Sequence, residues 1–171
     1  MRNLAFVALG IALAVAESFL DHVLPTEYLT PDLVLPLIVY MGLLGFNATR
    51  GAAIAFVIGY VADTLQPGAP ICLNMFVLVC LFLISRLLAA RLLLAGAFFH
   101  VLLVFLMSVA SSLIVIALRA IFERHVGSLV YLATVIPTSA VTTALISPIV
   151  FGVARRIDVK RGQRREERGL R

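Results

Sequence analysis

The feature that most limits what this chain can fold into is the length and number of its apolar runs. Six of them fill most of the 171 residues, and 62% of all residues are hydrophobic, against about half in an average soluble domain. Apolar blocks spread over most of a chain indicate an integral membrane protein and not a soluble domain with one anchor. The expected segments are 4–20, 33–44, 51–62, 71–88, 92–118 and 129–153. The sequence therefore predicts an all-α six-helix transmembrane domain over residues 1–153.

The positive charges predict how these segments cross the membrane. With six spans and the N-terminus in the cytoplasm, twelve of the fourteen Lys and Arg residues fall on the cytoplasmic side: Arg2, Arg50, Arg86, Arg91 and eight residues of the basic tail, 154–171. Only Arg119 and Arg124 fall outside. This imbalance follows the positive-inside rule and predicts that both termini are cytoplasmic. We expect the tail to contact anionic lipid and not nucleic acid.

Segments 33–44 and 51–62 are short for a membrane span. Each supplies about 18 Å of helix, against about 30 Å of bilayer hydrocarbon, and the first also contains Pro36. Short or interrupted helices often mark a cavity, a re-entrant element or a partner surface. Alternatively, each segment is lengthened by its flanking residues. The sequence leaves both interpretations open.

A stripe of small residues runs along segment 51–62 and ends in an acid. Gly51, Ala55, Gly59 and Asp63 recur at every fourth position, which lets helix backbones approach closely in a membrane. A carboxylate at a helix C-terminus opposes the helix macrodipole. We expect Asp63 either to organise the turn that follows by accepting bonds from backbone N–H groups or to contact a partner or ligand. Asn74 lies early in the next segment, so the two residues can meet.

Other polar residues favour structural roles. Glu17 and Asp21 share one helix face near the outer edge, where a solvated helix end is the expected interpretation. Hydroxyl groups recur along the last segment between two prolines, where they link helices and satisfy carbonyl groups that proline leaves free. These residues are Ser139, Thr143, Ser147, Pro137 and Pro148. His100 is expected to make a structural hydrogen bond, and Cys72 and Cys80 to act as small apolar side chains.

The motifs of common enzymes and metal sites are missing from the sequence. It contains no Walker A motif, no Gly-x-Ser-x-Gly, no His-Glu-x-x-His and no paired cysteines at metal-binding spacing. The predicted cytoplasmic loops are also too short for a nucleotide-binding domain. We therefore expect a protein that is not an enzyme and that uses no cofactor or metal.

Two motifs resemble those of a bacterial family. The stretch Pro-Asp-Leu-Val-Leu-Pro-Leu-Ile-Val-Tyr over 31–40 is similar to the opening of the second helix in rod-shape-determining MreD proteins. A Gly-x-x-x-Asp sequence, a Pro-Gly turn and Leu-Asn then follow in the family's order. The residues that carry the resemblance are Pro31, Asp32, Tyr40, Gly59, Asp63, Pro67, Gly68 and Asn74. The chain departs from the family at Ile71 and Cys72, where a glycine commonly precedes Leu-Asn, so the shape of this turn stays open.

The resemblance implies a scaffold of the cell-elongation machinery. MreD-like proteins are multi-pass proteins of the bacterial inner membrane that bind MreC and so support rod shape and peptidoglycan synthesis. Through MreC they connect to MreB, to RodA and to a class B penicillin-binding protein. Their fold is similar to that of the substrate-binding component of energy-coupling-factor transporters. A small-molecule, vitamin-type binding component of a transporter is therefore the alternative function, and the handling of lipid-linked precursors is a third.

Overall fold

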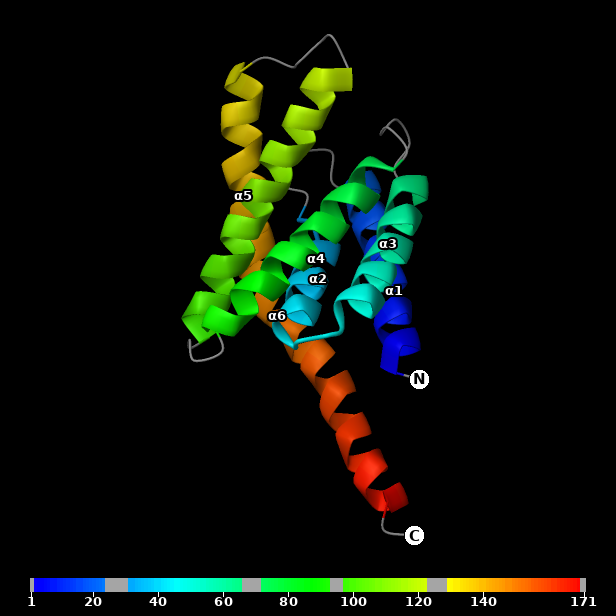
Figure 1. Ribbon diagram of the computed structural model, residues 1–171. Helices are drawn as coiled ribbons and strands as arrows, with labels where there is room; N and C mark the ends of the chain where they lie inside the picture. Colours follow the sequence, from blue (N-terminus) through cyan, green and yellow to red (C-terminus); the bar gives the residue numbers. More distant parts are fainter. Residues whose placement is uncertain (1, 24–30, 66–71, 93–96, 123–128, 170–171) are drawn as a thin grey trace.

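The computed structural model describes residues 2–23, 31–65, 72–92, 97–122 and 129–169, and all of its regular structure is helical. The six helices are α1 (Arg2–Val23), α2 (Val34–Leu43), α3 (Ala48–Leu65), α4 (Leu73–Leu92), α5 (Ala97–Phe122) and α6 (Leu129–Gly169). This confirms the all-α class for the described residues. The start of α1 and the end of α6 lie at the same end of the bundle, here called the terminal end (Figure 1).

Three helices contain segments that are long and apolar enough to cross a membrane. These segments are Asn3–Leu20 in α1, Phe99–Leu118 in α5 and Pro137–Ile157 in α6. Val34–Leu43 and Leu73–Ala89 are apolar but shorter. The chain is thus a membrane protein with three helices of spanning length and composition among the described residues.

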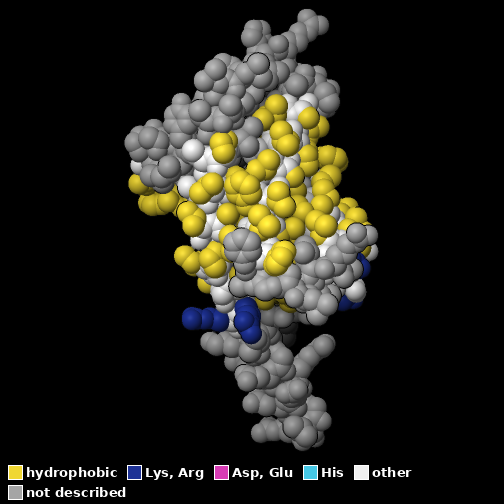
Figure 2. Space-filling view, turned by 90° about the vertical axis from the view of Figure 1, so that its left-hand side faces the viewer, with side chains coloured by type: hydrophobic (Ala, Val, Ile, Leu, Met, Phe, Trp, Pro, Cys, Tyr) yellow, Lys and Arg dark blue, Asp and Glu magenta, His cyan; other side chains and the backbone are white. Residues whose placement is uncertain are grey.

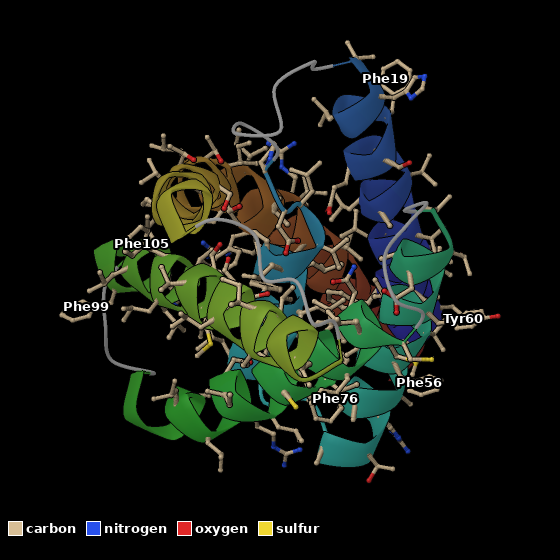
Figure 3. All side chains as sticks on the ribbon, turned by 90° about the horizontal axis from the view of Figure 1, so that it is seen from above. Phe19, Phe56, Tyr60, Phe76, Phe99 and Phe105 are labelled. Carbon is tan, nitrogen blue, oxygen red and sulfur yellow. The ribbon has the colours of Figure 1, made fainter. Side chains whose placement is uncertain are left out.

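The exterior of the bundle is apolar, as a lipid-facing surface must be. Figure 2 shows hydrophobic side chains covering most of the described part of one face. Large aromatic side chains are exposed on α1, α3, α4 and α5, and Figure 3 shows those of Phe56, Tyr60 and Phe76 together on the outer side of α3 and α4. A water-soluble monomer rarely exposes so much contiguous apolar surface.

Helix α2 is the centre of the packing. It contacts each of the other five described helices, and eight of its ten residues are buried. One face of α2, including Leu37, Ile38 and Met41, packs into a core shared mainly with α1, α3 and α4. The opposite face, with Leu35 and Val39, packs against α4 and α5. A helix of about 15 Å fits here because protein, not lipid, surrounds it. This accounts for the short apolar segment at 33–44 without a cavity.

The helices extend beyond several of the apolar runs that predicted them. Helix α3 begins three residues before the expected segment 51–62 and includes Asp63 and Thr64 at its end. Helix α6 continues past residue 153 through the segment expected as a basic tail, and ends at Gly169. Polar residues are accommodated in these extensions because they lie at helix ends, away from the apolar middle.

Candidate functional site

The small-residue stripe of α3 is the surface on which α4 packs. Gly51, Ala55 and Gly59 are all buried. A methyl group added at Gly51 would collide with the ring of Phe82, and one added at Gly59 would lie 2.5 Å from the Cα atom of Met75. Because the obstacle at Gly59 is backbone, it cannot move aside as a side chain can. The glycine is therefore required for α4 to begin this close to α3.

The Asp63 side chain caps the N-terminus of α4. Its Oδ1 atom accepts a bond from the backbone N–H of Asn74 at 3.1 Å, and its Oδ2 atom accepts one from Met75 at 3.2 Å. The first N–H groups of a helix have no partner within that helix, and the positive end of the macrodipole favours a carboxylate there. Asp63 opposes the dipole of its own helix but complements that of α4. This explains how an acid that is only 5% exposed is stabilised.

Gly59 and Asp63 form one structural unit with the start of α4. They lie one turn apart on α3, and both contact the segment Asn74–Met75. We call these four residues the hairpin clasp. The sequence suggested that Asp63 and Asn74 meet, and the contact is made through the backbone N–H of Asn74. Pro67 and Gly68, the predicted turn, lie outside the described residues.

The residue before the clasp has an unusual backbone conformation. Cys72, which directly precedes Leu73 and Asn74, has a φ angle of +77°. Side chains with a Cβ atom rarely adopt this left-handed region, whereas glycine enters it without strain. The rest of the turn, including Ile71, lies outside the described residues.

A second cap assembles at the start of α2 from three separate segments. Glu17 of α1 accepts bonds from the N–H groups of Leu33 and Val34 through Oε2, at 3.0 and 3.4 Å. Asp32 accepts a bond from the N–H of Leu35 at 2.8 Å. The next residue is Pro36, which has no N–H group and is well tolerated in a first helical turn. Every N–H from residue 33 to 35 therefore has a partner, and Pro36 does not interrupt the helix.

Helix α6 also takes part in this second cap. The hydroxyl oxygen of Thr143, which is fully buried, accepts a bond from the N–H of Asp32 at 3.0 Å. Next to Glu17, the hydroxyl of Ser18 donates to the carbonyl of Leu65 at 3.4 Å, at the end of α3. The C-terminal half of α1 is thus tied to the start of α2 and to the end of α3.

The expectation of a solvated end for Glu17 was wrong. Its carboxylate is partly buried and bound to α2, because the chain returns to α1 after the loop and presents unpaired N–H groups there. The side chain of Asp21 lies outside the described residues. An acid within an apolar run was the available signal for Glu17, but neither Glu17 nor Thr143 was predicted to bind α2.

The remaining predicted residues divide between the two ends of α2. Pro31 is buried beside the α2 cap, whereas Tyr40 lies two turns away, with its ring centroid 5.3 Å from that of Phe151 in α6. The imidazole of His100 in α5 contacts the same phenylalanine edge to face, at 6.0 Å. These three rings join α2, α5 and α6 and do not contribute to the caps.

One hydroxyl of the α6 stripe serves the role expected next to proline. Pro148 has no N–H group to bond the carbonyl of Ala144, four residues earlier. The Ser147 hydroxyl donates to that carbonyl at 2.7 Å and is fully buried. The hydroxyl thus satisfies the carbonyl that the proline leaves free, as predicted.

The described charges are segregated between the two ends of the bundle. The three carboxylates with described side chains, Glu17, Asp32 and Asp63, lie at helix ends opposite the terminal end and act in the caps. Four arginines with described side chains lie toward the terminal end: Arg50, Arg86, Arg155 and Arg156. In the described part of the chain, no three His, Cys, Asp or Glu side chains are grouped closely enough to hold a metal ion.

No family model, curated protein or solved structure matches the chain.

Proposed function

We propose that the chain is an MreD-like scaffold of the bacterial inner membrane, which binds MreC and supports rod shape and peptidoglycan synthesis. The observation that carries this proposal is the hairpin clasp. The Gly-x-x-x-Asp and Leu-Asn elements of the resemblance are separated in sequence, yet Asp63 accepts bonds from the N–H groups of Asn74 and Met75, and Gly59 packs against Met75. Motifs whose residues contact one another support the family resemblance better than the same residues at unrelated places in the fold.

Two further observations support the resemblance. Cys72 stands close to where the family commonly has glycine, and its φ angle of +77° is a conformation that glycine favours. The Pro-Asp-Leu opening of the other motif coincides with the start of α2, where Asp32 caps the helix. Both motifs therefore correspond to capped helix starts on the side of the bundle opposite the terminal end.

We also propose that all six helices cross the membrane, in a bundle similar to the substrate-binding component of energy-coupling-factor transporters. Helices α1, α5 and α6 have the length for this. The shorter α2 is shielded from lipid by its neighbours, so its hydrophobic length need not match the bilayer. The start of α1 and the last turns of α6 lie at the same end of the bundle (Figure 1), and the described arginines lie toward that end, which supports cytoplasmic termini.

A scaffold is favoured over a vitamin-binding component by how the polar groups are used. Both carboxylate oxygens of Asp63 accept bonds from α4, and Glu17 and Asp32 accept bonds at α2. The side chains of α2 fill the centre of the described bundle. The acids that could bind a ligand thus already stabilise helix starts.

Depletion of the chain in its own bacterial host tests this role. We expect the depleted cells to lose rod shape and become round, and a plasmid copy of the chain to restore it. The role is refuted if depleted cells keep their shape and the purified protein does not retain MreC. Mass spectrometry of the purified protein distinguishes the scaffold from the vitamin-binding alternative, because a transporter component would carry a small-molecule ligand.

A further inference from the structure

In the described part of the bundle, one guanidinium nitrogen is buried without a hydrogen-bond partner. The guanidinium of Arg86 in α4 has its Nη1 atom covered from solvent, and this atom makes no hydrogen bond. The residue is only partly buried, so the rest of the side chain is less enclosed. Arginine stays charged in proteins, and a buried charge is normally paired or hydrogen-bonded because its desolvation is costly. An unpaired guanidinium nitrogen therefore calls for an anionic group that completes it.

The described neighbours of Arg86 do not supply that group. Helix α4 passes so close to the end of α2 that a methyl group added at Gly42 would lie 3.2 Å from the backbone nitrogen of Arg86. The carbonyls of Tyr40 and Gly42 at this end of α2 already accept bonds from Leu44 and Gly45. The Ser85 hydroxyl donates to the carbonyl of Phe82.

The carboxylates of the described bundle also do not pair with Arg86. Glu17, Asp32 and Asp63 are engaged in the caps on the side opposite the terminal end. Arg86 is the fourteenth residue of the twenty in α4, about 20 Å along the helix from the Asp63 cap. An ion pair between Arg86 and Asp63 is therefore impossible without rearrangement of the bundle, and Glu17 and Asp32 are held by their bonds at the start of α2.

We propose that Arg86 binds a phosphate group at the membrane interface, supplied by the headgroup of an anionic phospholipid. The planar guanidinium presents parallel N–H donors that match phosphate oxygens. Two arginines of α6, Arg155 and Arg156, are exposed toward the same end of the bundle, and their charges favour an anion there. Figure 2 shows Lys and Arg side chains at the lower margin of the hydrophobic surface, where a bilayer places its phosphates. The phosphate would supply the acceptor that the buried Nη1 atom of Arg86 lacks.

Lipid retention measured by native mass spectrometry tests the site. Full-length protein is purified in mild detergent and incubated with phosphatidylglycerol, with phosphatidylcholine or with inorganic phosphate. We expect wild type to retain one phosphatidylglycerol at the lowest concentrations. Arg86→Gln should bind it about tenfold more weakly, since a hydrogen bond to a charged group is lost. Arg86→Lys should bind with intermediate strength, because the charge remains without the planar donors.

Arg50→Gln is the matched control, because it removes an exposed arginine at the same end of the bundle. It should keep the affinity for the first phosphatidylglycerol within about twofold. The proposal is overturned if a folded Arg86→Gln protein retains phosphatidylglycerol as well as wild type does. It is also overturned if Arg50→Gln weakens the binding of the first phosphatidylglycerol as much as Arg86→Gln does. If the protein binds inorganic phosphate tightly and does not prefer phosphatidylglycerol to phosphatidylcholine, the proposal that a phospholipid supplies the phosphate is overturned. If Arg86→Gln does not fold, two other results decide the outcome. Wild type must prefer phosphatidylglycerol to phosphatidylcholine, and Arg86→Lys must bind phosphatidylglycerol more weakly than wild type; failure of either overturns the proposal.

Discussion

Replacing Asp63 with alanine tests the hairpin clasp. The substitution leaves the N–H groups of Asn74 and Met75 without their acceptors, which lie at 3.1 and 3.2 Å in the native protein. A hydrogen bond to a charged group contributes about 1.5–3 kcal/mol, and loss of a helix N-cap costs about 0.5–2 kcal/mol. Because Asp63 is only 5% exposed, water replaces it poorly. We expect the free energy of unfolding to fall by about 2–3 kcal/mol.

The asparagine variant separates charge from geometry. Asp63→Asn keeps one acceptor oxygen, but its NH₂ group faces an N–H donor and the favourable charge at the start of α4 is lost. We expect about half the alanine effect, roughly 1–2 kcal/mol. Thr64→Ala is the control, since the Thr64 hydroxyl is exposed and bonds only within α3. It should change stability by less than about 0.5 kcal/mol.

Two measurements on the detergent-solubilised protein check this prediction. Unfolding by denaturing detergent reports the stability of each variant, and hydrogen exchange reports the N–H groups of residues 74 and 75 directly. In Asp63→Ala these two groups should exchange faster, while those in the middle of α4 stay protected. The capping argument is refuted if Asp63→Ala is as stable as Thr64→Ala and both N–H groups exchange at the wild-type rate.

Three other substitutions give distinct results in the same unfolding assay. Gly59→Ala should destabilise the protein by about 1–3 kcal/mol, because the new methyl group collides with the Met75 backbone. Gly152 has open space around it, so Gly152→Ala should be neutral or slightly stabilising. Equal effects of the two substitutions would contradict the close contact at Gly59. Glu17→Gln should cost about 1–2 kcal/mol and speed the exchange of the N–H groups at residues 33 and 34, and unchanged exchange would contradict the second cap. Cys72→Gly should stabilise the protein by up to about 1 kcal/mol, because glycine adopts the left-handed conformation without strain. A less stable Cys72→Gly protein would contradict the strain argument.

The sequence predicted helix number and approximate position well, because hydrophobic length is a local property. It also predicted the stripe of α3, since residues spaced by four lie on one helix face. The sequence left Asp63 open between an acceptor for backbone N–H groups and a partner or ligand contact, and the structure shows the acceptor role. These features depend on residues that are near in sequence or repeat with the helical period.

The features that could not be predicted depend on contacts between distant segments. Glu17 binds α2 sixteen residues further along the chain, and Thr143 binds Asp32 across 111 residues. Hydropathy reports neither contact. The short α2 was ambiguous for the same reason, since length alone does not reveal whether lipid or protein surrounds a helix. Its burial depends on all five other helices.

Copurification with MreC tests the central proposal most directly. The tagged full-length chain and the MreC of the same bacterium are co-expressed, extracted in mild detergent and purified through the tag. The scaffold proposal predicts a stable complex that survives size-exclusion chromatography, with a lower yield for Asp63→Ala than for Thr64→Ala. Wild-type protein that elutes folded and alone, with MreC left in the flow-through, would contradict the proposal.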